Sequence, residues 1–287
     1  MSDQANRLRD LARLQEPEPA LFSSRVMAIS SGKGGVGKTN VVAGLAMALA
    51  QQGQRVVVLD ADFGLANLDI LLGLNPTWTL EQVLRGERLV EEILLDGPFG
   101  IRIIPASSGI QELTRLDAAA ELRLVQGLQR ISATSDWMLI DTAAGIHDSV
   151  IKLLMAAQEV LLVTTPEPTA LVDAYAMVKV VHLRDPNKPL WLLVNNAQGE
   201  EEATETIEQL QAAAGRFLNR QLQVLGMLPA DPCVLQAVRQ QRGVLELYPQ
   251  APVCTALRAA AQILQAKIPL QKDGFAAFWK ELRVEEL

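Results

Sequence analysis

The fold of this chain is decided by the stretch Ser31-Gly32-Lys33-Gly34-Gly35-Val36-Gly37-Lys38-Thr39. It satisfies the GxxxxGK[ST] pattern of a phosphate-binding loop, in which glycines let the backbone turn with its N–H groups toward the phosphates. The apolar run at residues 25–30 predicts a strand before the loop, and residues 39–52, closed by Gly53, predict a buried helix after it. Strand, glycine loop and helix together predict a nucleotide-binding site.

Two side chains of this loop carry defined chemistry toward ATP or ADP. We expect Lys38 to reach the β- and γ-phosphates and Thr39 to place its hydroxyl on Mg²⁺. The helix that starts there adds the positive end of its dipole to the anion site. The nucleotide-binding residues expected in the loop are Gly32, Lys33, Gly34, Gly35, Val36, Gly37, Lys38, Thr39 and Asn40.

The rest of the chain predicts an α/β fold. Apolar, β-branched runs occur at residues 55–60, 137–141, 160–165, 190–195 and 222–228, most of them separated by enough chain for a helix. This pattern predicts a three-layer P-loop NTPase with a mostly parallel twisted sheet and helices on both faces. Three of the runs end in Asp60, Asp141 and Asn195, so these side chains should meet the loop at the carboxyl ends of the strands.

Composition narrows the class of protein. The chain has 287 residues, a formal net charge of −7 and two cysteines in no metal-binding pattern. The acidic balance argues against a broad phosphate-neutralising surface, so we expect no nucleic acid partner and do not favour a ParA-like DNA segregator. Neither a secretory leader nor a run of about 18 uncharged apolar residues is present, which predicts a cytoplasmic protein.

The extra lysine of the loop, Lys33, adds a resemblance. Residues 32–39 resemble the deviant Walker A family that includes MinD, ParA, the nitrogenase iron protein and the arsenite pump ATPase. The resemblance implies an ATP-sandwiched homodimer in which Lys33 crosses to the partner subunit's phosphates, much as an arginine finger supplies charge in trans. The alternative for Lys33 is a solvated loop lysine. The iron-sulfur members need cluster-ligating cysteines, which this chain does not offer.

Two acidic segments resemble the switches of the same family. Residues 60–69 resemble switch I, and residues 141–145 resemble switch II. The resemblance makes Asp62 the candidate for orienting the attacking water, so the expected catalytic residues are Lys33, Lys38 and Asp62. Asp141 is expected to hold Mg²⁺ through water, and Gly145 to let the backbone follow the γ-phosphate. Asp60 is either a further Mg²⁺ ligand or a cap at the end of its strand.

Base recognition is expected at two further positions. Asn195 matches the place where the family puts an asparagine on the adenine edge, and Pro229 and Asp231 belong to a segment that resembles the second loop beside the base. An amide suits a purine because it both donates and accepts hydrogen bonds. The neighbouring Asn196 remains an alternative to Asn195.

The first residues narrow the resemblance to one family. Residues 3–9, DQANRLR, match the DQAxxLR element of the flagellar number regulators called FlhG or FleN. In that family the element is a helix that docks on the GTPase FlhF and stimulates GTP hydrolysis. The resemblance implies that Gln4 is offered to the nucleotide site of FlhF, and the expected partner-binding residues are Asp3, Gln4, Ala5, Leu8, Arg9 and Leu11. The alternative is a helix that packs on its own domain.

The last residues carry one apolar helical face. Phe275, Phe278, Trp279 and Leu282 follow the i, i+3, i+4, i+7 spacing. FlhG and MinD end in amphipathic helices that bind membrane in the ATP dimer, and this segment is expected either to do the same or to dock on the body. Its basic and acidic residues balance, so apolar insertion would have to dominate over attraction to anionic lipid. The predicted units are a helix and tether at 1–20, the ATPase domain at 21–270 and this helix at 271–287.

The function expected from these features is a slow, Mg²⁺-dependent regulatory ATPase. It would switch between an ADP monomer and an ATP homodimer, set flagellar number and placement, and stimulate FlhF. A flagellar transcriptional activator and flagellar C-ring proteins are further expected partners. ATP-dependent contact with the inner face of the cell membrane, at a cell pole, is also expected. The alternatives are a non-catalytic ATP-binding adaptor or anti-activator and a MinD-type positioner of the division site.

Overall fold

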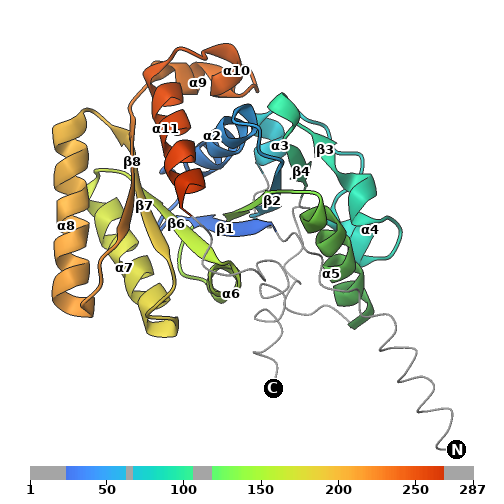
Figure 1. Cartoon of the computed structure of the whole chain (residues 1–287), viewed down its shortest axis with the longest axis horizontal. Coiled ribbons are helices and arrows are strands. Elements are labelled where there is room, and N and C mark those ends of the chain that lie inside the picture. Colours follow the sequence, from blue (N-terminus) through green and yellow to red (C-terminus); the bar gives the residue numbers. More distant parts are fainter. Residues whose placement is uncertain (1–23, 63–66, 106–117, 268–287) are drawn as a thin grey trace, which may run out of the picture.

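The computed structural model describes residues 24–62, 67–105 and 118–267, and these form one eight-stranded sheet between two layers of helices (Figure 1). The strand order is β3-β4-β2-β5-β1-β6-β7-β8, and every neighbouring pair is parallel except β3 with β4. The strands are β1 (Arg25–Ser30), β2 (Val56–Ala61), β3 (Leu95–Asp96), β4 (Arg102–Ile104), β5 (Trp137–Thr142), β6 (Glu159–Thr164), β7 (Leu190–Ala197) and β8 (Gln223–Pro229).

Crossover helices connect the parallel strands, as the sequence predicts. The helices are α2 (Lys38–Gln51), α3 (Leu68–Leu71), α4 (Leu80–Leu84), α5 (Ala118–Ala133), α6 (Asp148–Ala156), α7 (Pro168–Arg184), α8 (Glu200–Leu218), α9 (Pro232–Arg239), α10 (Val244–Leu247) and α11 (Pro252–Ala266). Two short 3₁₀ turns, Val90–Ile93 and Pro98–Gly100, lie beside β3. The predicted α/β three-layer architecture is therefore confirmed.

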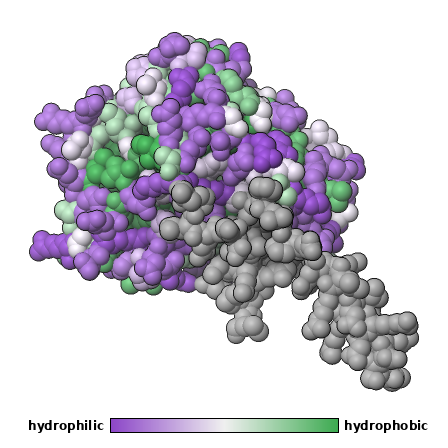
Figure 2. All heavy atoms as spheres, viewed as in Figure 1, coloured by the Kyte–Doolittle hydropathy of each residue, from purple (hydrophilic) through white to green (hydrophobic). Residues whose placement is uncertain are grey.

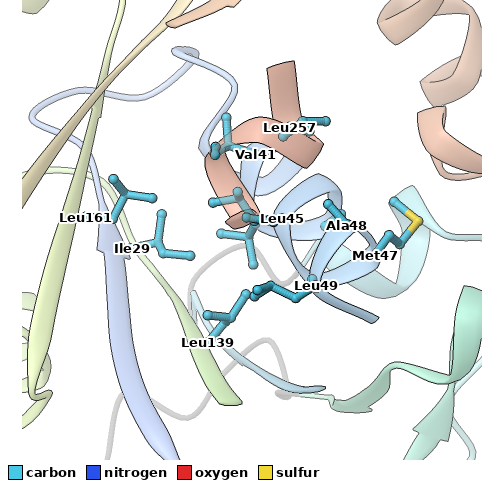
Figure 3. Packing of buried hydrophobic residues seen from close by; sticks show 14 of the residues in the cluster. Ile29, Val41, Leu45, Met47, Ala48, Leu49, Leu139, Leu161 and Leu257 are labelled. Carbon is cyan, nitrogen blue, oxygen red and sulfur yellow. The ribbon is translucent and has the colours of Figure 1, made fainter. Parts of the chain in front are cut away.

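Alternate residues of each central strand enter opposite layers of the core. In β1, Val26 and Ala28 join a buried cluster with α5, α6 and α7, whereas Met27 and Ile29 join a second cluster with α2 and α11. Such near-continuous apolar strands are typical of a parallel sheet covered on both faces. Figure 3 shows the second cluster, in which α2 lies between the sheet and Leu257 of α11.

The close contact between α2 and α11 includes a glycine. A Cβ built on Gly44 would lie 2.7 Å from a methyl group of Leu257, so a larger residue at position 44 would require the Leu257 side chain to shift. The contact holds α2, and with it the first turn that follows the glycine loop, against the body.

At the amino ends of the central strands, a buried ion pair ties the two ends of the described body together. We call it the Arg25 clamp. Arg25 at the start of β1 makes two hydrogen bonds of 2.7 Å to the carboxylate of Glu159, which also accepts one from the indole N–H of Trp191 at 2.6 Å. The same guanidinium donates to the backbone carbonyls of Leu264 and Lys267, 3.0 Å away in the second case. The end of α11 is thereby fixed beside the beginning of β1.

Residues 63–66 of the segment resembling switch I lie outside the described residues, and so do two predicted helical segments. These are the N-terminal helix and tether at 1–20 and the amphipathic helix around Phe275 and Trp279, whose structure is not described here. Over the described ranges, no helix has the length and apolarity needed to cross a membrane. The surface in Figure 2 is mostly hydrophilic outside the grey atoms, with apolar groups confined to small areas.

Candidate functional site

The glycine loop lies between β1 and α2, at the carboxyl edge of the sheet. Gly37 has φ of 83°, in the left-handed region that favours glycine, and a Cβ there would lie 2.5 Å from the side-chain nitrogen of Asn195. That nitrogen donates a 2.8 Å hydrogen bond to the carbonyl of Val36. The end of β7 therefore supports the loop directly, and both the backbone angle and the close approach require glycine at position 37.

A buried ion pair sits at the centre of the site. The ammonium of Lys38 pairs with the carboxylate of Asp141 at the end of β5, and only 7% and 1% of the two side chains are exposed. Burial raises the pKa of the Asp141 carboxyl, while the Lys38 charge and hydrogen bonds from Lys38 and Thr39 oppose that rise. The structure thus brings three predicted site residues, Lys38, Thr39 and Asp141, into direct contact.

Asp60 lies opposite Asp141 in the register between β2 and β5. Its carboxylate accepts hydrogen bonds from the backbone N–H groups of Asp62, Asn67 and Leu68, at 3.1, 3.2 and 3.2 Å. Burial, followed by the nearby charge of Asp141, raises the pKa of Asp60 to about 7. Asp60 therefore caps the backbone that follows its strand, which was one of its two predicted roles. Because it also lies beside Asp141, Mg²⁺ binding by Asp60 stays a prediction.

The switch residues lie around the same pair. The negative charge of Asp62 contributes to the raised pKa of Asp141, so Asp62 acts electrostatically on the centre of the site. The backbone N–H of Gly145 donates to the carbonyl of Ser31 at 2.8 Å, and its φ of 92° again favours glycine. The segment resembling switch II is thus attached directly to the phosphate loop.

Lys33 points away from this cluster. Its ammonium donates 2.9 Å hydrogen bonds to the carboxylate of Glu167 and to the hydroxyl of Thr169, at the start of α7. Sequence reasoning missed Glu167 and Thr169, although both lie in the TTPEPT segment after β6. The signal in the sequence that could have indicated Glu167 is that an acidic residue follows the end of a predicted strand. Its pairing with Lys33 depends on the strand order, which places β6 beside β1.

The residues predicted to flank the base have structural roles of their own. Asp231 caps the N-terminus of α9 by accepting from the N–H of Cys233 at 2.9 Å, and it also accepts from the N–H of Val253 at the start of α11, at 3.3 Å. Pro229 ends β8 opposite Ala197 in the register. Base recognition by Asn195, Pro229 and Asp231 stays a prediction.

The oxygen atoms around Lys38 form a donor set that suits Mg²⁺. Mg²⁺ is held by one or two carboxylates, with the remaining positions filled by water and phosphate oxygens. Thr39, Asp60 and Asp141 offer one hydroxyl and two carboxylates, and Asp60 lies opposite Asp141 in the register between β2 and β5. Among the residues that the structure describes, no group of three or more histidine, cysteine, aspartate or glutamate side chains is placed to hold a metal ion.

Comparisons with known proteins agree with this geometry. A family model described as an AAA domain matches residues 24–188. The antiactivator FleN of Pseudomonas aeruginosa is 42% identical over 91% of this chain and 94% of its own length. The flagellum site-determining protein YlxH of Helicobacter pylori is 32% identical over 98% of both chains.

Solved structures give the same result at the level of the fold. A chain of the MinC:MinD cell division protein complex of Aquifex aeolicus matches with a TM-score of 0.70 and 25% identity, over 86% of this chain and 99% of that one. MinD of Pyrococcus horikoshii, complexed with Mg-ADP, matches with a TM-score of 0.68 at 25% identity, over 84% and 96% of the two chains.

Fold and site together define a P-loop protein of the MinD and ParA type with a second lysine in its phosphate loop. The chain belongs, within that class, to the FleN (FlhG) family.

Proposed function

We propose that this protein is a MinD-like ATPase that alternates between an ADP-bound monomer and an ATP-bound homodimer, and that this cycle regulates flagellar number and placement. The observation that carries the ATPase is the buried pair of Lys38 and Asp141 beneath the glycine loop. Support for the flagellar role comes from nearly full-length similarity to a relative named antiactivator FleN and to one named a flagellum site-determining protein.

Binding would begin at the phosphate loop. The inward N–H groups of the loop and the N-terminus of α2 receive the phosphates, and Lys38 leaves Asp141 to contact the β- and γ-phosphates. Thr39 and Asp141, with Asp60 nearby, would hold Mg²⁺, which when bound neutralises charge on the phosphate oxygens. The exchange of partners by Lys38 makes ATP binding and the position of Asp141 interdependent.

Hydrolysis would need two further residues. Asp62 orients a water toward the γ-phosphate, and the partner subunit's lysine equivalent to Lys33 contributes positive charge across the dimer interface. Gly145 transmits the state of the γ-phosphate, because its N–H now bonds to the carbonyl of Ser31 within the loop.

Output would pass through segments outside the described residues. The DQANRLR element at 3–9 would dock on FlhF and stimulate its GTPase, as its resemblance to the FlhG element implies. The apolar face around Phe275 and Trp279 would contact the inner face of the membrane in the ATP dimer. A flagellar transcriptional activator and C-ring proteins complete the proposed partners.

The decisive experiment measures molecular mass in solution with ADP and with a non-hydrolysable ATP analogue, both with Mg²⁺. The chain has a mass of 31.2 kDa, and we expect that mass with ADP and twice that mass with the analogue. A monomer under both conditions, at concentrations well above those in cells, would exclude the nucleotide-driven dimer cycle.

A second candidate function is a non-catalytic ATP-binding adaptor that acts by sequestering a transcriptional activator. The printed name of the Pseudomonas relative, an antiactivator, favours this candidate. The two functions differ in turnover. An adaptor would bind ATP and dimerise without hydrolysing it. The purified wild-type chain and an Asp62→Ala variant would then release phosphate at the same rate.

A further inference from the structure

Lys33 has a defined binding site within its own chain. We propose that Glu167 and Thr169 form a cis holding site for Lys33, and that this site opposes the crossing of Lys33 to a second copy of the chain. The inference rests on the proposed dimer cycle and adds two positioning residues that regulate it. Two observations carry it: the hydrogen bonds that the Lys33 ammonium makes, and the close packing of the backbone that carries the two partners.

The Lys33 ammonium makes hydrogen bonds to two side chains of its own chain. The carboxylate of Glu167 and the hydroxyl of Thr169 each lie 2.9 Å from the Lys33 nitrogen. The Lys33 side chain is one-third exposed, at 33%, and Glu167 is 64% exposed, so the pair lies at the surface and can open without unfolding anything. A lysine held there cannot at the same time donate to phosphates in another subunit.

The backbone segments that carry these groups pack closely against each other. A Cβ on Gly32 would lie 2.3 Å from the carbonyl carbon of Asp173, so the phosphate loop packs directly against the backbone of α7. The Ser31 hydroxyl donates to the Lys33 carbonyl at 2.9 Å, and Pro168 occupies the first turn of α7. Release of Lys33 is therefore a side-chain rotation, and the holding site stays formed when the lysine leaves.

The charge of Glu167 decides whether Lys33 stays. The N-terminus of α7 is the positive end of a helix dipole, which repels an ammonium. The Glu167 carboxylate, at the N-cap position, reverses that repulsion. A triphosphate bound in a second subunit carries several negative charges, so it should attract the Lys33 ammonium more strongly than one exposed carboxylate does. A diphosphate lacks the γ-phosphate and should attract Lys33 less strongly. The holding site thus raises the ATP dependence of dimer formation.

The expected size of the effect follows from the type of contact. An exposed ion pair and one neutral hydrogen bond together change an equilibrium by about threefold. A symmetric dimer releases two lysines, so loss of the holding site should lower the dimer dissociation constant by about tenfold.

The test is sedimentation equilibrium of the full-length chain with Mg²⁺ and a non-hydrolysable ATP analogue. Glu167→Gln keeps the length of the side chain and removes its charge but leaves the Thr169 hydroxyl in place, so we expect the dimer to tighten by about fivefold. Thr169→Val should tighten it by a smaller factor. The matched control is Glu201→Gln, which removes an exposed carboxylate from the first turn of the neighbouring helix α8 and should leave the constant unchanged.

The outcomes separate the holding site from the dimer cycle. If the wild-type chain dimerises and Glu167→Gln leaves the constant unchanged or weakens the dimer, the holding site is wrong and the cycle stands. If the wild-type chain stays monomeric while Glu167→Gln dimerises, the holding site is supported as a strong brake. If neither dimerises, both the cycle and the holding site fail. Unfolding curves that coincide for the two chains will show that the exposed substitution leaves the fold intact.

Discussion

At the scale of single residues, the site contains two ion pairs. Lys38 pairs with Asp141, and Lys33 pairs with Glu167, although both lysines belong to the same loop. The sequence predicts the loop itself, because its spacing is local. It does not predict either pairing, since Asp141 and Glu167 lie more than 100 residues further along and reach the loop only through the strand order.

The first prediction concerns Asp62. Replacing it by alanine should lower ATP turnover by about a hundredfold, because the attacking water loses the carboxylate that orients it. The ATP dimer should then persist, since hydrolysis is what resets it. Phosphate release and dimer lifetime on a sizing column measure the two effects. Normal turnover and normal lifetime in this variant would remove Asp62 from the proposed mechanism.

The second prediction concerns Lys38. Lys38→Ala leaves the carboxylate of Asp141 buried without its cation, which should cost about 3 kcal/mol of unfolding free energy at pH 8. Without Lys38 the pKa of Asp141 rises further, so the folded variant takes up a proton at low pH. The loss should therefore be small near pH 5 and should grow as the pH rises.

Urea unfolding of the nucleotide-free chain at several pH values tests this. Lys179→Ala, which removes an exposed lysine from α7, is the matched control and should change little. A pH-independent loss in the Lys38 variant would mean that Asp141 is not the group responsible.

At the scale of elements, six strands are predicted to within one or two residues, and two are not predicted. The apolar runs at the central strands are long because both faces are buried, which makes them visible in the sequence. β3 has two residues and β4 three, so neither forms a run that periodicity can detect. The Ile101 to Ile104 segment, which directly follows a glycine, was the available signal for β4.

The third prediction belongs to the N-terminal element. Removing residues 1–18 should abolish stimulation of the GTPase FlhF, while ATP binding should stay at the level of the full chain, since the described nucleotide site contains none of those residues. GTP turnover by FlhF, with and without the two forms, is the measurement. A Gln4→Ala chain provides the single-residue version. Equal stimulation by the truncated form would rule out the activator role.

The fourth prediction belongs to the C-terminal element. Deleting residues 274–287 should reduce ATP-dependent co-sedimentation with liposomes to the level seen without ATP, because the apolar face at Phe275, Phe278, Trp279 and Leu282 is removed. Raising the anionic lipid fraction should change binding of the full chain only modestly, since the charges of the segment nearly balance. Identical sedimentation of both forms would favour a helix that packs on the body.

At the scale of the whole molecule, the two sheet edges carry different tasks. The carboxyl edge holds the phosphate loop, Lys38 and the acidic residues, and the other edge holds the Arg25 clamp. The sequence predicts the site at the carboxyl ends of the strands, because several strands end in polar residues. It gives no sign of the Arg25 clamp, because Arg25, Glu159 and the end of α11 are far apart along the chain and meet only in the folded sheet.

The Arg25 clamp also has a consequence for chain connectivity. Because Arg25 reaches the carbonyl of Lys267, the body begins and ends at one place, and a short glycine-serine linker can join those two points. A circular permutant of residues 24–267, opened between the exposed Pro186 and Asn187, should fold and keep its affinity for ADP. Calorimetric titration with Mg-ADP measures this, against the unpermuted body. Such a permutant would carry its new chain ends at residues 186 and 187, where further domains could be attached.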